Sequence, residues 1–302
     1  MMRILVTDGM DQKAVSQLRA NGHEVVEQFY EPDQLGAALR EFDAVVIRSA
    51  TKIRAPHIEQ AKGSRLKLII RAGVGIDNID VADAEAAGIA VRNTPGASSA
   101  AVAELALAHM FSCARYVSIA GHTMREGKWE KKAYGKGVEV CGKTLGIWGY
   151  GRIGMALARM AHGLGMTVLV NNRSGKTAGP DDPATWVPVD ELLARSDFIS
   201  LNMPSTEAKP LINRESIAKM KDGVILINTS RGSNIDEDAL LDALNSGKVR
   251  AAGLDVYAEE PTKNEALYQH PAVSCTPHIG AGTREAQGRI GMEIVEIIES
   301  FG

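Results

Sequence analysis

Cysteine is scarce in this chain, and the few cysteines present follow no metal-binding or disulfide pattern. Cys113, Cys141 and Cys275 lie far apart, and no CxxC pair occurs. Structural zinc sites and disulfide frameworks use closely spaced or numerous cysteines. The sequence therefore predicts neither a disulfide scaffold nor a bound metal ion.

A long apolar run and an excess of one charge are also missing. No stretch reaches about 18 consecutive apolar residues, so no membrane-spanning helix is expected. The 34 basic and 37 acidic side chains give a formal net charge of −3, which is not the basic footprint of a nucleic-acid binder. Asp8 follows the N-terminus too closely for a signal peptide, and a cytoplasmic protein is predicted.

What the sequence does have is a repeated α/β pattern. Short apolar runs alternate with amphipathic segments such as Lys13–Ala20 and Pro32–Leu39, which is typical of parallel sheets with crossover helices. The strands expected in a first block lie at 3–8, 23–28, 43–49, 66–75 and 88–95. Those of a second block lie at 143–149, 166–172, 197–203, 223–230, 251–257 and 272–277.

This pattern predicts an α/β fold in which a Rossmann-type doubly wound parallel sheet is joined to a smaller, flavodoxin-like α/β domain. The Rossmann-type domain, which the glycine-rich turn described next assigns to a dinucleotide, is expected at 94–283. The substrate-binding domain is expected at 1–93, together with a final helix at 284–302. That helix has an apolar stripe that includes Ile290 and Ile294.

A glycine-rich turn opens the second block. The motif GYGRIG, at 149–154, stands between an expected strand and an expected helix, the context in which such turns bind a pyrophosphate. Gly149 permits the tight turn, Gly151 lets the backbone approach the anion, and Gly154 allows the helix to pack closely on the strand. The helix N-terminus presents its N–H groups to the anion. The alternative is a purely structural turn.

Asn172 occupies the position, about twenty residues after the glycines, that usually carries an acidic residue. Arg173 and Ser174 follow it, and Lys176 comes shortly after. A neutral Asn removes the repulsion of a 2′-phosphate, and the following side chains add hydrogen-bond donors. The sequence therefore favours NADP(H) over NAD(H). The alternative is that Asn172 serves the ribose of NAD, with Arg173 over the adenine.

Further motifs follow successive strands of the second block, namely NTSRGSNIDEDAL at 228–240, AGLDVYAEEP at 252–261 and TPHIGAGT at 276–283. Together with GYGRIG they closely resemble the D-2-hydroxyacid dehydrogenase family, and the similarity covers essentially the whole chain. VIRSATKI at 46–53 and RAGVGIDNID at 71–80 are most similar to its D-3-phosphoglycerate dehydrogenase branch. The resemblance implies hydride transfer between NAD(P) and a small D-2-hydroxy acid.

The resemblance assigns the three catalytic roles to Arg231, Glu260 and His278. Chemistry supports the assignment, because oxidation of a secondary alcohol needs a proton acceptor that titrates near neutrality, and imidazole is one. A neighbouring carboxylate favours the imidazolium, and a guanidinium grips a carboxylate with a planar fork. The alternative for each residue is an ordinary packed or surface side chain.

The resemblance also implies contacts to the cofactor. Thr229 and Ser230 would line the nicotinamide, Asp255 would hold its amide, and the start of the helix after the glycine turn would face the pyrophosphate. Asn202 departs from the family, which often has His there. The full predicted set is Gly149, Gly151, Arg152, Ile153, Gly154, Asn172, Arg173, Ser174, Asn202, Met203, Pro204, Thr229, Ser230, Asp255 and Gly280.

The substrate contacts are predicted in the first block. By resemblance, Val74 and Gly75 would offer N–H groups to the substrate carboxylate. Arg48, Lys52 and Arg71 match the residues that meet a phosphate in the phosphoglycerate branch, which favours 3-phosphoglycerate and 3-phosphohydroxypyruvate as the substrate pair. One alternative is that these three are solvated strand-end charges. The other is a glyoxylate or hydroxypyruvate reductase using NADPH, which the cofactor prediction favours.

One long helix is expected from Ser98 to about Glu126, and its 100–120 segment is more apolar than a surface helix needs. In the family this helix packs across a two-fold axis, so a homodimer is predicted. The C-terminal regulatory domain of larger phosphoglycerate dehydrogenases is not expected here. A dinucleotide-sensing regulatory protein of the same fold is a further alternative, although no peptide-binding extension or basic region is visible.

Overall fold

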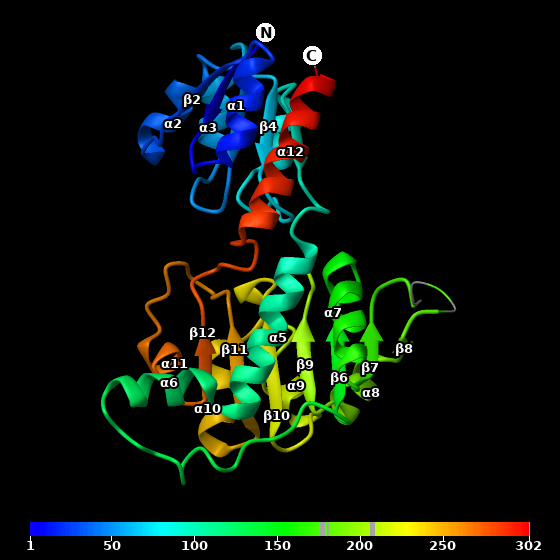
Figure 1. The fold of residues 1–302 in the computed structure, drawn as a ribbon. Helices are drawn as coiled ribbons and strands as arrows, with labels where there is room; N and C mark the ends of the chain where they lie inside the picture. The colour runs from blue at the N-terminus through cyan, green and yellow to red at the C-terminus, as the bar shows by residue number, and fades with distance from the viewer. Residues whose placement is uncertain (176–178, 180, 206–208, 302) are drawn as a thin grey trace. The chain divides into compact units, whose positions relative to one another are not determined.

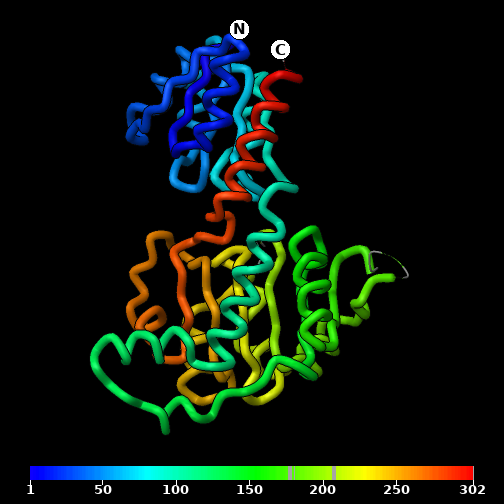
Figure 2. Tube along the Cα trace, in the orientation of Figure 1, coloured from blue at the N-terminus to red at the C-terminus, as the bar shows by residue number. Residues whose placement is uncertain are grey.

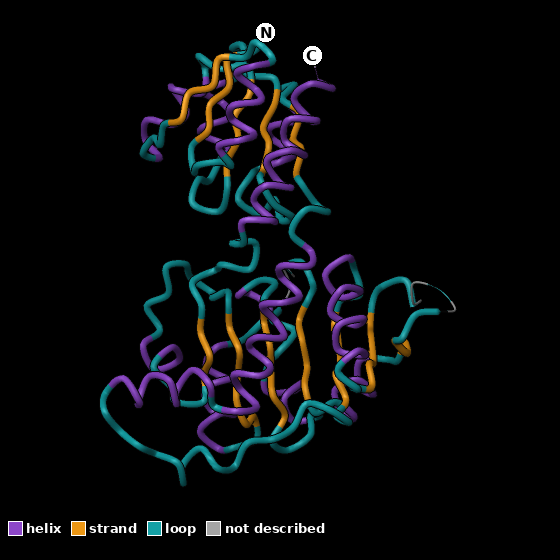
Figure 3. Tube along the Cα trace, viewed as in Figure 1, coloured by secondary structure: helices purple, strands orange, loops and turns teal. Residues whose placement is uncertain are grey.

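The computed structural model describes most of the chain, namely residues 1–175, 179, 181–205 and 209–301. Lys176, named above as a possible donor to a 2′-phosphate, lies outside the described residues. The chain forms two units, Met1–Ser98 with Ala281–Gly302, and Ser99–Gly280. Within each unit, helices and strands alternate along the chain (Figures 1 and 3).

The first unit contains a five-stranded sheet in the order β2-β1-β3-β4-β5, with parallel pairing throughout. Its strands are β1 Arg3–Val6, β2 Glu24–Glu27, β3 Ala44–Ile47, β4 Leu68–Arg71 and β5 Ala90–Asn93. Its helices are α1 Gln12–Ala20, α2 Pro32–Leu39, α3 Ala55–Ala61, α4 Val81–Ala86 and α12 Arg284–Phe301. Both chain termini belong to this unit (Figure 2).

Both faces of the five-stranded sheet are covered, because successive strand residues point to opposite sides. Ile4 and Val6 of β1 pack on one face with buried side chains of α1 and α12. Leu5, between them, packs on the other face with side chains of α2 and α3. The strands are therefore apolar without alternation, as parallel strands buried on two sides must be.

The second unit contains a seven-stranded parallel sheet in the order β12-β11-β10-β9-β6-β7-β8. Its strands are β6 Thr144–Trp148, β7 Thr167–Asn171, β8 Ala184–Trp186, β9 Phe198–Leu201, β10 Val224–Asn228, β11 Val249–Leu254 and β12 Val273–Cys275. Its helices are α5 Ser99–Arg115, α6 Val117–Arg125, α7 Arg152–Gly163, α8 Val189–Arg195, α9 Arg214–Ala218, α10 Glu237–Ser246, α11 Glu265–Tyr268 and the 3₁₀ helix η1 Gly232–Asn234.

The strand order of the second sheet reverses at β6. Leu145 and Ile147 of β6 pack under α5 and α7 on one face, whereas Leu226 and Leu254 pack with α8, α9 and α10 on the other. Strand β6 lies between β7 and β9. The strands β7 and β8 follow on one side of it, and β9 to β12 follow on the other side. Ligands of open α/β sheets bind at the carboxyl ends of the strands at such a reversal.

The structure differs from the prediction at two elements. A seventh strand, β8, was not predicted, because it is three residues long and only Ala184 in it is buried. The single helix predicted from Ser98 to Glu126 is two helices, α5 and α6, which are separated at Tyr116. That residue has a left-handed φ of 60°, and its hydroxyl accepts a hydrogen bond from the Arg250 guanidinium at 2.8 Å. The break is therefore fixed by a contact with β11, distant in sequence.

The unit boundaries lie a few residues from the predicted positions of 93/94 and 283/284. Ala97 is buried and Ala281 packs with it in the core of the first unit, beside α12. The Arg289 side chain of α12 also donates from Nε to the Ala97 carbonyl oxygen at 2.8 Å. The segments up to Ser98 and from Ala281 therefore belong with the five-stranded sheet.

Candidate active site

The glycine turn joins β6 to α7. Gly149 has a φ of 108°, and a Cβ there would lie 2.5 Å from the Asn202 carbonyl group, so no side chain fits. A Cβ at Gly154 would lie 2.5 Å from the Gly149 carbonyl oxygen, so only glycine lets α7 pack on the turn. At Gly151 a Cβ would meet no atom within 4 Å. The turn is therefore open at the glycine that was predicted to admit an anion.

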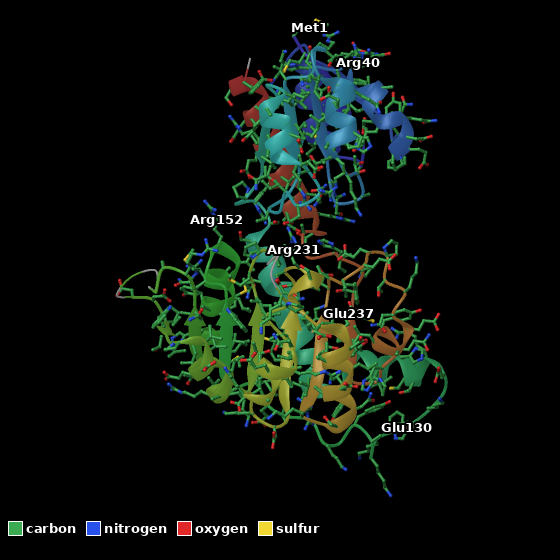
Figure 4. All side chains as sticks on the ribbon, turned by 180° about the vertical axis from the view of Figure 1, so that it is seen from behind. Met1, Arg40, Glu130, Arg152, Arg231 and Glu237 are labelled. Carbon is green, nitrogen blue, oxygen red and sulfur yellow. The ribbon has the colours of Figure 1, made fainter. Side chains whose placement is uncertain are left out.

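The first turn of α7 is suited to a negatively charged group. Gly151 is its N-cap and makes no side-chain cap hydrogen bond. Arg152 is exposed, and its side chain points outward at the helix start (Figure 4), whereas Ile153 is half-buried. Uncapped N–H groups and the helix dipole favour a pyrophosphate at this position. These residues therefore fit the phosphates of a dinucleotide.

The chain segment directly after β7 carries neutral and basic side chains. Asn172 comes first, and its Oδ1 accepts a hydrogen bond from the Ser174 hydroxyl at 3.1 Å. Arg173 and Ser174 are both exposed. A guanidinium and a hydroxyl beside a neutral amide offer donors to an anion and no repulsion.

Two buried oxygen atoms at the ends of β9 and β10 have no hydrogen-bond partner among the described residues. They are Asn202 Oδ1 and Thr229 Oγ1. The Asn202 amide nitrogen donates to Ser200 Oγ at 3.1 Å, so only its oxygen is left over. A buried polar atom without a partner costs free energy, which a ligand carrying N–H or O–H groups would remove. Met203 and Pro204 follow Asn202 at the same strand end.

Two buried asparagines shape the loop that carries Arg231. Asn228 accepts a hydrogen bond from the Ser230 N–H at 3.0 Å and donates to the Arg231 carbonyl oxygen at 2.8 Å. Asn234 donates to the Met203 carbonyl oxygen at 3.0 Å, which ties the end of β10 to the end of β9. Arg231 Nη1 donates to the Ser230 carbonyl oxygen at 2.6 Å. Figure 4 shows Arg231 at the same end of the sheet as Arg152.

His278 and Glu260 come from different loops and form a direct pair. His278 Nδ1 lies 2.7 Å from Glu260 Oε2, and Glu260 Oε1 accepts a hydrogen bond from the Tyr257 N–H at 3.2 Å. The Glu260 carboxylate occupies the Nδ1 side of the His278 ring, so Nε2 is the ring nitrogen that remains for a substrate. The His278 side chain is 31% exposed. The pair is therefore arranged to move a proton at Nε2.

Glu260 stays ionised to lower pH than an ordinary glutamate. Burial opposes its ionisation, but the hydrogen bond and charge of His278, the Tyr257 N–H and the charge of Arg231 outweigh burial and hold the pKa of the carboxyl below its usual range. The three predicted catalytic side chains are therefore electrostatically coupled.

Asp255 organises the turn that carries His278. Its Oδ1 accepts from the Thr276 hydroxyl at 2.6 Å and the Ile279 N–H at 2.8 Å, and its Oδ2 accepts from the Gly280 N–H at 2.8 Å. His278 has a left-handed φ of 52°, a strained conformation that such bonds can maintain. Asp255 and Gly280 were predicted to contact the cofactor, and in the structure they bond to each other.

Two further residues hold neighbouring loops of the site together. A Cβ at Gly232 would lie 1.9 Å from the Tyr257 carbonyl group, so the two backbones are in direct contact. Glu237, at the start of α10 (Figure 4), accepts hydrogen bonds from the Ala258 N–H and the Asn264 side chain, both at 2.8 Å. The loop that carries the glutamate of the pair is therefore held from both sides.

In the first unit, the predicted substrate residues follow β3 and β4, which pair side by side. Asp8, at the end of β1, accepts hydrogen bonds from the N–H groups of Arg48 at 2.7 Å and Thr51 at 3.0 Å. The Asp8 carboxylate thus fixes the loop after β3. On that loop Arg48 is half-buried and Lys52 is exposed.

Arg71 folds onto the loop after β4. Its Nη1 donates to the next residue's carbonyl oxygen at 3.0 Å, and a Cβ at Gly73 would lie 1.5 Å from that nitrogen. Val74 is 38% exposed, and its carbonyl oxygen accepts from Asn93 Nδ2 at 2.5 Å. Gly75 is half-buried. The guanidinium of Arg71 is thus engaged with its own loop.

Sequence reasoning did not identify the side chains that hold these loops. They lie on the connections that follow strands or at a helix start, and they are Asp8, Asn78, Asn228, Asn234 and Glu237. Short Asp and Asn side chains at strand ends are a signal for backbone hydrogen bonding. Which distant backbone each one holds depends on the tertiary fold.

In the part of the chain that the structure describes, no three His, Cys, Asp or Glu side chains gather as a metal site would need. The three cysteines are free thiols, of which Cys113 is buried. None of the helices described combines the length and apolarity needed to cross a membrane.

Nucleotide binding alone does not require a histidine hydrogen-bonded to a glutamate beyond the strand ends, as His278 is to Glu260. An open glycine turn, such a pair and an arginine, all beyond the carboxyl ends of one parallel sheet, are typical of a dinucleotide-linked dehydrogenase. A family model described as "D-isomer specific 2-hydroxyacid dehydrogenase, NAD binding domain" matches residues 107–280. The chain belongs to the D-isomer specific 2-hydroxyacid dehydrogenase family. It is an NAD(P)-dependent oxidoreductase acting on a CH–OH group.

Three relatives illustrate the range of the family. Hydroxypyruvate reductase of Thermotoga maritima is 49% identical over 98% of this chain and 97% of its own length. D-3-phosphoglycerate dehydrogenase 2, chloroplastic, of Arabidopsis thaliana is 44% identical over 98% of this chain but 48% of its own length, so the chain spans about half of that relative. The structure of a glyoxylate reductase from Paecilomyes thermophila superposes with a TM-score of 0.87, at 33% identity, over 99% of this chain and 94% of that one.

Proposed function

We propose that this dehydrogenase reduces hydroxypyruvate or glyoxylate, with Arg231, Glu260 and His278 as its catalytic residues. The 2.7 Å contact between His278 and Glu260 is the observation that carries the assignment of roles. The 49% identity to hydroxypyruvate reductase, over nearly the full length of both chains, supports the substrate class. Motif similarity alone favours 3-phosphoglycerate as the substrate. The comparisons with known proteins give better support to hydroxypyruvate or glyoxylate.

Each catalytic residue has a distinct task in the reduction of an oxo acid. Arg231 binds the substrate carboxylate and polarises the adjacent carbonyl. Protonated His278 donates its Nε2 proton to the carbonyl oxygen, which becomes the product hydroxyl, and Glu260 orients the ring and stabilises its charge. A bound dinucleotide supplies the hydride that adds to the carbonyl carbon. In the oxidation direction, neutral His278 accepts the hydroxyl proton.

The residues that would hold the dinucleotide lie at the carboxyl ends of β6, β7, β9 and β10. The open turn at Gly151 and the first turn of α7 would hold the pyrophosphate. Asn202 and Thr229 would bond the nicotinamide end through their buried oxygen atoms. The neutral Asn172 and the exposed Arg173 beside it support a preference for NADP(H).

The strand orders support assigning a role to each unit. Counted from β6, the second sheet has the order 7-6-5-4-1-2-3, which is the order of dinucleotide-binding Rossmann sheets with one added strand. The first sheet has the flavodoxin-like order 2-1-3-4-5. We assign the second unit to the dinucleotide. The first is assigned to the substrate, with Val74 and Gly75 as donors to its carboxylate.

One steady-state experiment tests substrate and cofactor together. It measures kcat/KM for hydroxypyruvate, glyoxylate and 3-phosphohydroxypyruvate, each with NADH and with NADPH. We expect hydroxypyruvate or glyoxylate with NADPH to give the highest value. A higher value for 3-phosphohydroxypyruvate would overturn the substrate proposal, and a higher value with NADH would overturn the cofactor preference. No turnover with any oxo acid would contradict the assigned catalytic roles.

A phosphorylated substrate is the second candidate, and Arg48 tests it. If Arg48 meets a phosphate, Arg48→Ala raises KM for 3-phosphohydroxypyruvate far more than KM for glyoxylate. Arg92→Ala, at an exposed arginine of the same sheet, is the control. Small and equal effects of Arg48→Ala on both substrates would remove the phosphate site.

We also propose that the chain forms a homodimer. Large apolar side chains of α5, α6 and the segment after them are exposed, namely Phe111, Val117, Met124 and Trp129. Exposed apolar side chains gathered on neighbouring elements are typical of an interface between protein chains. We propose that a second copy of this chain covers them. The free thiols support a cytoplasmic location, where cysteines stay reduced.

A further inference from the structure

His109 is a buried histidine that the proposed reaction does not use. It lies on α5, is 3% exposed, and faces β11 and β12. Gly253 of β11 makes room for it, since a Cβ there would lie 2.5 Å from His109 Cβ. An apolar side chain would fill this place between helix and sheet more cheaply, because burying an imidazole costs free energy unless both nitrogens are hydrogen-bonded. The ring must therefore have a polar task.

Both ring nitrogens of His109 are hydrogen-bonded to residues of β12 and the turn that follows it. Nδ1 lies 3.0 Å from Ser274 Oγ, and Nε2 lies 3.0 Å from Thr276 Oγ1. Thr276 Oγ1 in turn lies 2.6 Å from Asp255 Oδ1. A chain of polar groups thus runs from the helix through the strand end to a buried carboxylate.

The direction of each hydrogen bond follows from counting donors. The Asp255 carboxylate can only accept, so the Thr276 hydroxyl donates to it. Thr276 Oγ1 must then accept from His109, which places the imidazole proton on Nε2 and leaves Nδ1 to accept from the Ser274 hydroxyl. Burial lowers the pKa of His109, against the opposing charge of Asp255, which agrees with this neutral form. Every donor in the chain points toward the carboxylate, an arrangement in which each bond strengthens the next.

The carboxylate at the end of this chain controls the backbone around His278. Asp255 accepts from the N–H groups of Ile279 and Gly280, the two residues after His278. The His278 N–H donates to the Asp255 and Thr276 carbonyl oxygens at 2.8 and 3.1 Å. The left-handed backbone at His278 is therefore bonded on both sides to residues that the His109 chain reaches.

We propose that His109 is a positioning residue that fixes the orientation of the His278 imidazole, acting through Thr276 and Asp255. The proposal rests on the catalytic role proposed for His278. Helix α5 thereby controls the turn that holds the proton-transferring ring. His109 itself touches neither the reacting atoms nor the proposed cofactor contacts.

Four variants separate positioning from simple core packing. His109→Leu removes both ring hydrogen bonds, whereas His109→Gln keeps an N–H donor at the same number of bonds from Cα as Nε2. Thr276→Val breaks the chain at the next link. Met110→Leu is the control, because it introduces the same side chain at an adjacent, fully buried position of α5.

We expect His109→Leu and Thr276→Val each to lower kcat by about 10-fold to 100-fold, the effect of a small misplacement of a reacting group. KM for the dinucleotide should change less than kcat. His109→Gln should stay within about 3-fold of the parent, and Met110→Leu should match the parent. The double variant H109L/T276V should lose no more than one of its single variants, since both break one chain.

Contrary outcomes are specific. Equal losses in His109→Leu and Met110→Leu, a His109→Gln as slow as His109→Leu, or additive losses in the double variant would each overturn the proposal. If His109→Leu does not fold, the comparison of His109→Gln with Thr276→Val decides, and parent-like kcat in both would overturn it.

A second readout does not depend on turnover. The NMR signal of the His278 Cε1–H group, assigned with His278→Asn and recorded without substrate, should move in Thr276→Val and His109→Leu and stay in place in Met110→Leu. An unmoved signal in the first two variants would overturn the positioning role. Absence of turnover in the parent chain would instead contradict the proposed function, so the two failures can be told apart.

Discussion

At the scale of single residues, the site depends on side chains that hold backbone as much as on side chains that would touch substrate. Asp255 uses both carboxylate oxygens on the turn around His278. Asn228 holds the Arg231 carbonyl oxygen. Proton transfer needs an imidazole placed to within a fraction of an ångström, and such placement comes from these backbone contacts.

Glu260→Gln should lower kcat for oxo acid reduction by about 10-fold or more, because the carboxylate that holds the His278 ring in place is lost. Glu259→Gln is the matched control, because that neighbour is exposed and pairs with Lys263. Steady-state kinetics would measure both variants, and a parent-like kcat in Glu260→Gln would refute the role of Glu260.

The same carboxylate predicts how stability depends on pH. The folded-state pKa of Glu260 lies below the ordinary value, so the unfolded chain takes up the proton first as pH falls. Its contribution to stability is therefore present above about pH 4.3 and is lost as pH falls through the lower folded value. Urea unfolding of the parent and Glu260→Gln should give different midpoints at pH 7 that converge in acid. A difference that grows in acid would contradict the assigned shift.

At the scale of elements, the site is a set of loops at the carboxyl ends of parallel strands, tied to one another. Asn234 joins the end of β10 to the end of β9, and Glu237 joins the start of α10 to the loop after β11. Strands position these loops only approximately. The ties between loops bring the three proposed catalytic residues within reach of one another.

Gly232→Ala should damage both activity and stability. Its Cβ would lie 1.9 Å from the Tyr257 carbonyl group, so the two loops would have to separate at a cost of about 1–3 kcal/mol. Gly163→Ala is the control, because it lies in α7 with open space around its Cβ position, and it should be neutral or stabilising. Thermal unfolding and kcat/KM of both variants test this, and a fully active Gly232→Ala would show that the close approach is dispensable.

Glu237→Ala should lower kcat/KM for oxo acid reduction by about 10-fold, because it frees the loop that carries Glu260. The neighbouring Asp238→Ala removes a similar charge from the first turn of α10, where both acids favour the helix dipole. Only Glu237 also accepts from the Ala258 N–H and the Asn264 side chain. Equal losses of kcat/KM in the two variants would attribute the effect to the helix and not to the loop.

At the scale of the whole molecule, each unit has its own sheet with a core on both faces. Helices α5 and α6 of the second unit nevertheless leave large apolar side chains exposed. Helix α5 packs on one face of the second sheet, whereas α6 has no buried residue, and its Val117 and Met124 are 60% and 57% exposed. Because such a face is costly to leave in water, a partner surface is expected.

Val117→Glu combined with Met124→Glu should convert a dimer to a monomer, since two buried charges without partners would oppose association. Sedimentation equilibrium of the parent and the double variant over a range of concentrations would measure this. Trp186→Glu, at an exposed apolar residue of β8, is the control. A parent chain that is monomeric at all concentrations would contradict the proposed interface.

Much of the fold could be predicted because hydrophobic periodicity and glycine placement are local signals. The expected strands around β1, β3, β6 and β10 are present, since each is an apolar run between turn residues. The break at Tyr116 and the short β8 could not be predicted, because contacts distant in sequence fix them. The three proposed catalytic residues were assigned from motifs. The hydrogen bonds that hold the loops around them could not be predicted, because they join residues with no shared sequence pattern.

The sequence by itself determined the α/β class and the position of the glycine turn, because alternating apolar runs and turn residues act through neighbours in the chain. The proposed catalytic triplet came from the resemblance of its motifs to a family. Only the tertiary structure decided which polar groups are hydrogen-bonded to one another. Glu260 contacts the His278 ring, Asp255 bonds the turn around His278, and His109 bonds the Thr276 hydroxyl. Those pairings join residues far apart in sequence. Their geometry exists only once parallel strands bring their carboxyl ends to one edge of the sheet.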